Sequence, residues 1–349
     1  MSKKIYTRTI NPDGARFCSS PWNTVSITND TRPGRPRSGD VEMCLCRDWQ
    51  TSEPIGNIFD KPLSEIFNDV IATKFRNTIL DQSFSYCDTN ICGRYWEMKR
   101  VVSLDYEINK IKKTLPTNLA LGLDSNCNLS CASCRSESIF SPQIDESAWQ
   151  ILTKLSDEYR DFQEPTEISI DSSGDIFASA VWRKYLNSNN IPKCFRFRIT
   201  TNGNLITKNL DLIENIKDQI SEVTVSLDAG TSDTYKEIRG GSFKLVIEGI
   251  EALVSMGIKV GTQFVLQQKN YKEIIIYRDL ASSLNVNWIG LSQIVHWFHM
   301  SPEYWNANKL EDNPNIDYEL LVESLRKFST VHNGIIGTMS GGLLKLIKE

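Results

Sequence analysis

The sequence predicts an α/β fold, a partial (β/α)6 TIM-like barrel preceded by a small cysteine-rich α+β domain. Two observations predict it. After residue 115, short apolar runs alternate with amphipathic helical patterns, as in parallel βα units. Before residue 115 the chain is polar, rich in Gly and Pro, and carries five of the nine cysteines. Six βα units are fewer than the eight of a closed barrel, so we expect an open barrel with its active loops at the carboxyl ends of the strands.

In the first part of the chain, apolar residues recur at helical spacing over 62–78 and, more weakly, over 95–113. The stretches 22–27 and 40–43 alternate as the two strands of a short hairpin do. Such a small domain has a thin core, and thin cores are commonly stabilised by bound metal.

The second part supplies six strands and five helices between them. The expected strands are 118–124, 167–170, 195–200, 222–228, 260–266 and 286–292. The expected helices are 146–159, 175–186, 210–218, 243–256 and 271–281. A last helix near 318–328 and the GTMSGG stretch are expected to cap the barrel. This organisation predicts three regions, 1–114, 115–292 and 293–349.

Composition narrows the class of protein. The chain has 349 residues, 40% hydrophobic and 23% charged, with a formal net charge of −4, which argues against nucleic-acid binding through bulk positive charge. No signal-like amino terminus and no run of eighteen apolar residues appears, so we expect a cytoplasmic protein without membrane spans. Clustered cysteines in a reducing compartment indicate metal rather than disulfides.

Three of these cysteines follow the first expected strand of the barrel with the spacing C-x3-C-x2-C: Cys127, Cys131 and Cys134. Three thiolates can hold three irons of a cubane cluster and leave the fourth iron open to a ligand. An open position distinguishes a reactive metal site from a structural one. The alternative is a zinc site completed by a remote Cys or His, although no His lies nearby.

The motif resembles the signature of the radical S-adenosylmethionine (radical SAM) superfamily. The resemblance implies that Cys127, Cys131 and Cys134 hold a [4Fe–4S] cluster whose open iron binds S-adenosylmethionine. Reduction by a partner such as flavodoxin or ferredoxin then cleaves the sulfonium and gives a 5′-deoxyadenosyl radical, which abstracts hydrogen from a substrate. The family's aromatic residue before the third cysteine is Ser133 here, which leaves the adenine contacts open.

Further motifs occur in the family's order, and the resemblance implies that they contact S-adenosylmethionine or the substrate. SGD stands where the family has Gly-Gly-Glu, TTN follows the third strand, SLD the fourth, and one Gln lies on the fifth. The implied residues are Ser173, Gly174, Asp175, Thr200, Thr201, Asn202, Ser226, Asp228 and Gln263. Read without the resemblance, SGD is a helix N-cap and TTNG a turn. Arg239 pairs with a carboxylate or lies at a surface helix end.

The early cysteines, with IGNIF and a helix between them, resemble the auxiliary modules called SPASM or twitch domains. That resemblance implies a second [4Fe–4S] cluster on Cys18, Cys44, Cys87 and Cys92, with the role of Cys46 undecided. Zinc is the alternative, because spacing does not distinguish the two. The second site either relays electrons or stabilises its domain.

Two remaining features carry alternatives. Cys194, just before the third strand, is a hydrogen-atom donor or a small buried hydrophobe. The stretch 293–305, with His296, Trp297 and His299, lines the substrate opening or packs in the core.

Three functions follow for comparison. The first is a radical SAM enzyme that modifies a peptide. The second is radical dehydrogenation or epimerisation of a sugar-type or nucleoside-type molecule. The third is a non-catalytic iron–sulfur scaffold or redox sensor, against which the complete cysteine triad and the ordered motifs argue.

Overall fold

A computed structural model describes most of the chain. The described residues are 14–29, 37–44, 53–89, 92, 95, 98, 100–101, 104, 114–135, 137–170, 174–296, 300–328, 336–340 and 343. They divide into two compact units, one of residues up to 123 with 150–166, the other of 124–149 with residues from 167 onward. The three-region division expected from the sequence stays a prediction.

The first unit contains a sheet in the order β6-β2-β3-β4. Strand β2 (Thr24–Thr28) pairs antiparallel with β3 (Asp40–Met43) and parallel with β6 (Asn118–Gly122), while β3 pairs antiparallel with β4 (Gly56–Asn57). The predicted hairpin is therefore confirmed. Alternate residues of these strands, among them Val25, Ile27 and Val41, are buried and apolar, as the period of two requires.

Two short strands, β1 (Ala15–Arg16) and β5 (Arg100–Val101), form a separate antiparallel pair. The predicted helix over 95–113 is wrong at residues 100–101, where the backbone pairs across a strand instead. Much of the rest of that stretch lies outside the described residues.

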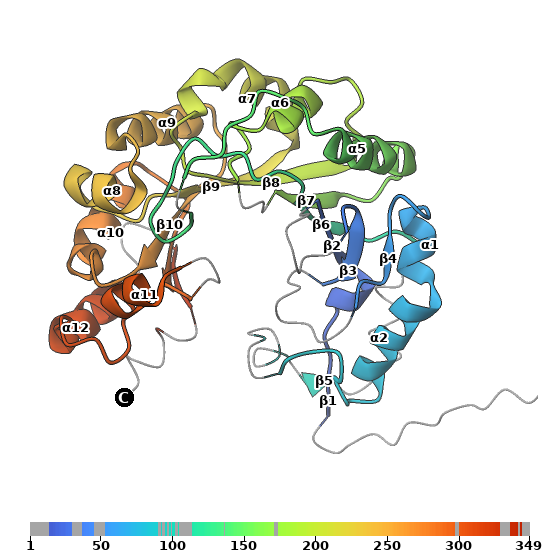
Figure 1. The fold of residues 1–349 in the computed structure, drawn as a ribbon, viewed down its shortest axis with the longest axis horizontal. Coiled ribbons are helices and arrows are strands. Elements are labelled where there is room, and N and C mark those ends of the chain that lie inside the picture. Colours follow the sequence, from blue (N-terminus) through green and yellow to red (C-terminus); the bar gives the residue numbers. More distant parts are fainter. Residues whose placement is uncertain are drawn as a thin grey trace, which may run out of the picture. The chain divides into compact units, whose positions relative to one another are not determined.

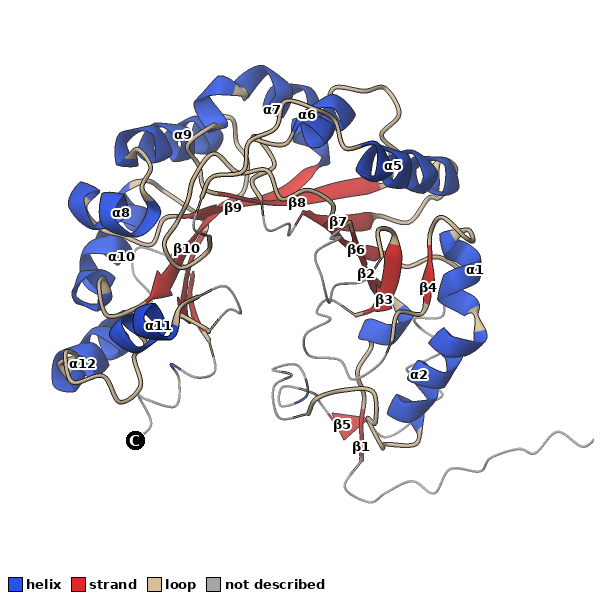
Figure 2. Cartoon of the chain, viewed as in Figure 1, coloured by secondary structure: helices blue, strands red, loops and turns tan. Residues whose placement is uncertain are grey.

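The single helix predicted over 62–78 is two helices, α1 (Leu63–Asn68) and α2 (Val70–Leu80). Asp69 interrupts it with an extended backbone and accepts a hydrogen bond from the Val70 N–H, so it caps α2. Both helices lie beside β3 and β4 (Figure 2). Glu158, in the part of α5 (Glu146–Tyr159) that belongs to this unit, accepts from the Leu63 N–H at 2.6 Å.

The second unit contains a sheet in the order β7-β8-β9-β10-β11-β12. Its strands are β7 (Thr166–Ile170), β8 (Phe195–Thr201), β9 (Ile220–Ser226), β10 (Val260–Leu266), β11 (Trp288–Gln293) and β12 (Ile336–Met339). From β8 to β12 all neighbours pair in parallel. The expected parallel α/β arrangement is confirmed, but β12 was expected to be a cap and is instead a further parallel strand.

Helices connect these strands and lie along one face of the sheet, as Figure 1 shows for α6 to α10. The helices of this unit are α6 (Ala180–Leu186), α7 (Leu210–Ile216), α8 (Ser232–Arg239), α9 (Phe243–Ser255), α10 (Ile274–Ser283), α11 (Pro302–Asn308) and α12 (Tyr318–Phe328). Helix α9 buries Val246, Ile250 and Leu253 at the spacing of one helical face.

Helix α6 begins five residues later than predicted because Ser179 caps it, its side chain accepting from the Trp182 N–H. The preceding residues from Asp175 instead form a turn. This turn matters below, because it follows β7 at the carboxyl edge of the sheet.

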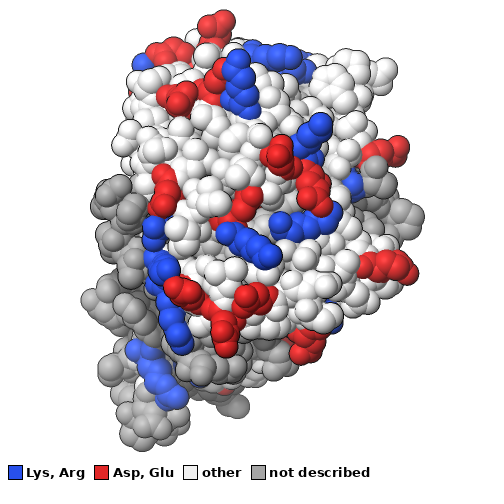
Figure 3. All heavy atoms as spheres, turned by 90° about the vertical axis from the view of Figure 1, so that its left-hand side faces the viewer, with Lys and Arg blue, Asp and Glu red and all other residues white. Residues whose placement is uncertain are grey.

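The surface that carries α8, α10 and α12 has acidic and basic side chains interspersed, without a large area of one sign (Figure 3). Within the described residues, every helix is too short or too polar to cross a bilayer.

Candidate functional site

The loop that carries the three close cysteines is held at its start, over residues 124–127. Asp124, directly after the first strand of the pattern, accepts from the Asn126 N–H at 2.8 Å and from its side-chain Nδ2 at 2.6 Å. The Ser179 hydroxyl donates to the other oxygen of Asp124. At the far side, the Cys127 N–H donates to the Ile139 carbonyl at 2.6 Å. The first thiol therefore leaves a fixed turn rather than a free loop.

Two of the three thiols are buried and one is exposed. Cys127 and Cys131 are 9% and 8% exposed, whereas Cys134 lies at the surface. Burial raises the pKa of Cys127 and of Cys131, and in both cases the neighbouring thiol of Cys134 adds to the effect. Both thiols are therefore protonated at neutral pH and release their protons when they bind a cation.

Gly174 brings the turn after β7 against this loop. A Cβ at Gly174 would lie 2.3 Å from the Asn126 carbonyl oxygen and 2.8 Å from that of Asp124, so only glycine fits. The next residue, Asp175, donates its N–H to the same Asn126 carbonyl at 2.7 Å. Ser173, also predicted here, lies outside the described residues.

Asp175 is buried, with 2% exposure, and its carboxylate accepts bonds from the protein itself. One oxygen accepts from the Thr201 hydroxyl at 2.8 Å and the Asn202 N–H at 2.7 Å, and the other from the Phe177 N–H at 3.0 Å. Burial raises its pKa, and these hydrogen bonds oppose that rise. Asp175 therefore joins the end of β7 to the end of β8; its predicted contact with S-adenosylmethionine stays a prediction.

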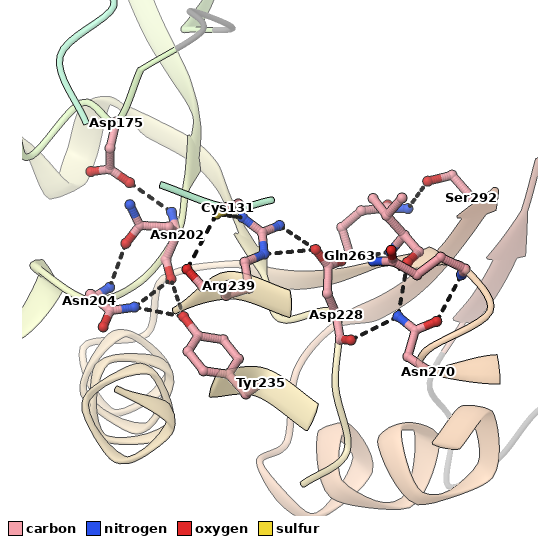
Figure 4. A network of polar contacts seen from close by, with 12 residues as sticks. Cys131, Asp175, Asn202, Asn204, Asp228, Tyr235, Arg239, Gln263, Asn270 and Ser292 are labelled. Carbon is pink, nitrogen blue, oxygen red and sulfur yellow. Dashed lines mark hydrogen bonds and ion pairs between the residues drawn. The ribbon is translucent and has the colours of Figure 1, made fainter. Parts of the chain in front are cut away.

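Asn202 extends the same network to the cysteines. Its Nδ2 donates to Asn128 Oδ1 at 3.0 Å and lies 3.7 Å from Cys127 Sγ, while its Oδ1 accepts from the Asn204 N–H at 3.0 Å (Figure 4). The predicted Thr201 and Asn202 thus lie in one hydrogen-bonded unit with the first thiol.

A second contact with the thiols comes from the end of α8. Arg239 Nη1 lies 3.8 Å from Cys131 Sγ, and Arg239 Nε and Nη2 lie 2.7 and 2.6 Å from Asp228 Oδ2. Asp228 follows β9 in the left-handed backbone region, at φ 55°, where side chains other than glycine are uncommon. Figure 4 shows the row Cys131–Arg239–Asp228. Arg239 is the carboxylate partner expected from the sequence rather than a surface residue.

The remaining predicted residues lie on neighbouring strands. Gln263 on β10 pairs in register with Ser226 on β9, and its Nε2 donates to Ser292 Oγ at 3.0 Å. Thr200 lies on β8 beside Thr224 of β9 and is half-buried. Thr200 and Ser226 lie at the carboxyl ends of their strands, the edge at which α/β sheets carry their sites, whereas Gln263 lies in the middle of β10.

Three supporting residues escape prediction from sequence. Asn204 donates to Tyr235 Oη at 2.7 Å, and the Tyr235 hydroxyl reaches the Asn202 carbonyl. Burial raises the pKa of Tyr235 to about 12. Asn270 Nδ2 donates to the Asp228 carbonyl at 2.9 Å and so holds the left-handed turn. Of these three residues, only Asn204 has a local sequence signal, because it follows the turn dipeptide Asn202-Gly203.

In the first unit, the four predicted thiols Cys18, Cys44, Cys87 and Cys92 are partly buried and lie near one another. Burial raises the pKa of Cys87 to about 12, and the Cys18, Cys44 and Cys92 thiols add to the rise. Cys44 leaves β3 in the left-handed region at φ 74°, a conformation that costs energy and is common at functional sites. Cys46 lies outside the described residues.

Within each of the two groups, the thiols that the structure describes lie near one another but do not converge on one point. Among the side chains that the structure describes, no three Cys, His, Asp or Glu converge on a position for a single metal ion.

Cys194 is buried directly before β8, at the opposite end of that strand from Thr201 and Asn202. His296 packs against Trp305 with ring centroids 5.3 Å apart, whereas Trp297 and His299 lie outside the described residues. The position of Cys194 favours the buried-hydrophobe interpretation.

Comparison with known families agrees with these two groups of thiols. Residues 125–281 match the model of the radical SAM superfamily, and residues 18–93 match that of the SPASM iron–sulfur cluster-binding domain. The first match begins at the cysteine loop, and the second begins at Cys18 and ends just after Cys92. The chain therefore carries a radical SAM domain over residues 125–281 and, before it, a SPASM iron–sulfur cluster-binding domain over residues 18–93.

Curated relatives match parts of the chain. A probable GTP 3′,8-cyclase of Saccharolobus solfataricus is 34% identical over 99 residues, which is 28% of this chain and 31% of that protein. A probable GTP 3′,8-cyclase of Methanococcus aeolicus is 24% identical over 205 residues, 56% of this chain and 65% of that one. The matches thus span about a third to two thirds of these relatives.

Among solved structures, SuiB of Streptococcus suis aligns with a TM-score of 0.50 and 16% identity over 97% of this chain and 74% of that chain. At this identity the likeness concerns the fold alone. It agrees with the partial barrel expected from the sequence.

The residues fit the groups that the family implies. Cys127 and Cys131 are buried beneath nitrogen donors from Asn202 and Arg239, and donors to sulfur are what an anionic thiolate-bound cluster requires. Cys134 of the same loop is exposed, and its role as the third ligand stays a prediction. Radical SAM and SPASM domains imply S-adenosylmethionine and iron–sulfur clusters as cofactors.

Proposed function

We propose that the chain cleaves S-adenosylmethionine reductively at a [4Fe–4S] cluster on Cys127, Cys131 and Cys134 and abstracts hydrogen from a peptide substrate. The observation that carries the proposal is the donor-flanked, mostly buried three-thiol loop at the carboxyl edge of a parallel sheet. A cluster with one open iron, when bound, supplies the electron that splits the sulfonium into methionine and a 5′-deoxyadenosyl radical.

The chain's own residues position this chemistry. Asp124 and Gly174 fix the cysteine loop against the turn after β7, and Asp175 ties that turn to the end of β8. Gln263 in the middle of β10 and Ser226 at the end of β9 lie side by side in register and offer hydrogen-bonding groups for S-adenosylmethionine or the substrate. The electron comes from an external one-electron donor, for which we propose flavodoxin or ferredoxin.

A peptide is the preferred substrate because two cations on the segments that follow β9 and β10 are already paired with carboxylates. Arg239 pairs with Asp228, and Lys269, shortly after β10, pairs with Glu237 at 2.9 Å. Gln263, Ser292 and Tyr304 are neutral hydrogen-bonding groups of the kind that amide-rich ligands engage. The resemblance to SPASM or twitch modules favours a peptide as well, because relatives with such modules frequently modify peptides.

A nucleotide substrate is the second candidate, and the curated relatives favour it because they are probable GTP 3′,8-cyclases. A triphosphate needs several unpaired cations at its site. The two candidates therefore predict different charge requirements at the same edge of the sheet.

For the first unit, we propose a second [4Fe–4S] cluster on Cys18, Cys44, Cys87 and Cys92. It is supported by the SPASM match and by the mutual proximity of the four thiols. Four thiolates leave no iron open, so this cluster relays electrons or stabilises its domain. Iron and sulfide counts decide between this cluster and zinc: about eight irons per chain support two cubanes, while about four irons and one zinc indicate a structural zinc site.

The proposed cleavage is tested by anaerobic reconstitution, reduction with dithionite and chromatography for 5′-deoxyadenosine. The wild type is expected to form it, and Cys134→Ser to form none while unfolding at the same temperature, because Cys134 is exposed. Cys194→Ala, a cysteine outside the loop, is expected to keep the product. A well-loaded, reduced wild type that forms none would favour the scaffold function.

The substrate class is tested by adding GTP, or a short precursor peptide from a neighbouring gene, to the same reaction. Each substrate is deuterated at carbon. Deuterium found in 5′-deoxyadenosine then shows which ligand donates the hydrogen. Transfer from GTP, with none from the peptide, would replace the peptide proposal by the nucleotide one.

A further inference from the structure

We infer that Arg239 and Asp228 set the reduction potential of the cluster on Cys131, with Arg239 raising it and Asp228 lowering it. This inference rests on the proposed function, since it concerns the cluster proposed there. Both are positioning residues: neither is needed as a cluster ligand.

The geometry links one guanidinium to two partners. Arg239 Nη1 lies 3.8 Å from Cys131 Sγ. Its Nε and Nη2 lie 2.7 and 2.6 Å from Asp228 Oδ2 (Figure 4). The two side chains are 14% and 5% exposed, so water screens the pair little. A guanidinium holds such divided contacts because its donors lie in one rigid plane.

Both charges are fixed by the surrounding backbone. The second oxygen of Asp228 accepts from the Val265 N–H at 2.6 Å, and Asn270 holds the Asp228 carbonyl. Arg239 is the last residue of α8, which ends at Gly240 in the left-handed region with φ 71°. The pair is thus pre-organised beside the thiol.

The thiol has a second contact with the same residue. Cys131 Sγ lies 3.6 Å from the Arg239 carbonyl oxygen, to which a protonated thiol donates. When the thiol binds iron its proton leaves, and the Nη1–H contact becomes the favourable one. Arg239 keeps its positive charge because the guanidinium group is not deprotonated in proteins.

The direction of each effect follows from charge. Reduction adds one electron to the cluster, and a nearby cation with an N–H donor on the ligand sulfur stabilises the reduced state. Asp228 has the opposite sign and opposes reduction. Removing the cation therefore lowers the potential, and removing the anion raises it. A purely structural pair would not give shifts of opposite sign.

The test is a redox titration of the reconstituted full chain, followed by electron paramagnetic resonance without S-adenosylmethionine. The signal that changes when S-adenosylmethionine is added afterwards identifies the cluster concerned. At a fixed potential, Arg239→Gln is expected to lower the reduced-to-oxidised ratio about tenfold, or 59 mV for one electron. Asp228→Asn is expected to raise it similarly, and Arg239→Lys, which keeps the charge but loses the fork, to lie between wild type and Arg239→Gln.

A control signal and a double variant separate an effect on this cluster from a general effect on the protein. Any signal from the Cys18 group should keep its potential in every variant. The double variant Arg239→Gln with Asp228→Asn is expected to return toward wild type. Unmoved potentials, or shifts of the same sign in both single variants, overturn the inference. A wild type without a cluster on the Cys127 loop instead overturns the proposed function.

Discussion

Replacing Gly174 by alanine tests whether the turn after β7 is built onto the cysteine loop. The added methyl carbon would lie 2.3 Å from the Asn126 carbonyl oxygen, whereas carbon atoms of real side chains essentially never approach closer than 3.0 Å. Both neighbouring atoms belong to backbone, so neither can rotate away. The loop, the turn or both must move.

The magnitude follows from three terms. Overpacking by one methyl group against fixed atoms costs about 1–3 kcal/mol. The shift also weakens the 2.7 Å bond from the Asp175 N–H to the Asn126 carbonyl, which is worth about 1 kcal/mol. The reduced freedom of alanine in the unfolded chain returns about 0.4–1 kcal/mol. We expect a net loss of about 1–3 kcal/mol in the free energy of unfolding.

The assay is denaturant unfolding of the metal-free chain, followed by iron loading and 5′-deoxyadenosine formation. Gly122→Ala is the matched control, because a Cβ there meets only Thr28 Cγ2 at 3.6 Å, an ordinary contact. The control should be neutral or slightly stabilising, since glycine within a strand costs about 0.5–1 kcal/mol. If Gly174→Ala unfolds and loads iron as Gly122→Ala does, the proposed attachment of the turn to the loop is wrong.

Three further predictions follow from the site. Cys87→Ser is expected to remove about half of the bound iron and leave the signal that responds to S-adenosylmethionine; loss of both signals would mean that the two thiol groups assemble together. Asn202→Asp replaces the donor at 3.7 Å from Cys127 Sγ with an anion, so iron retention during gel filtration should fall, and unchanged retention would refute the contact. The pKa of Tyr235 is raised to about 12, so its proton stays on in the folded state while the unfolded state loses it near 10; the associated stability is complete below pH 10 and is lost from there toward pH 12. In Tyr235→Phe, the free energy of unfolding, measured by urea titration, should therefore fall less steeply with pH in that window. A slope equal to that of the wild type would contradict the prediction.

The local features of the fold were predictable because their signals are local. Apolar runs placed the five inner strands from β7 to β11 within about two residues, and the helix over 146–159 was predicted with its exact bounds. The spacing of the cysteines alone indicated the cluster loop. In each case the evidence lies within a stretch of at most 14 consecutive residues.

The misses have physical causes. Asp69 looks like one polar residue on a helix, but its short carboxylate caps a new helix and ends the previous one. The strand β12 carries a glycine and only four residues, so its pairing with β11 supplies the stability that its sequence does not signal.

The site could be predicted only in part, since its contacts join distant segments. Arg239 meets Cys131 across 108 residues, and Gly174 fits against carbonyls of residues near 125. The resemblance identified Cys131 and Gly174 as candidates, whereas Arg239 was expected only as a partner of a carboxylate or as a surface residue. The bonds that make Asp175 a link between strands, and Arg239 the neighbour of a cluster ligand, exist only in the folded chain.

The open iron is most directly tested by electron–nuclear double resonance on the reduced full chain with S-adenosylmethionine labelled with ¹⁵N in the amino group and ¹³C in the carboxylate. The proposed function predicts hyperfine coupling from both labels on one cluster, absent in Cys134→Ser. A wild-type cluster that forms on the loop thiols without any coupling to either label, or that has a fourth protein ligand, would contradict it.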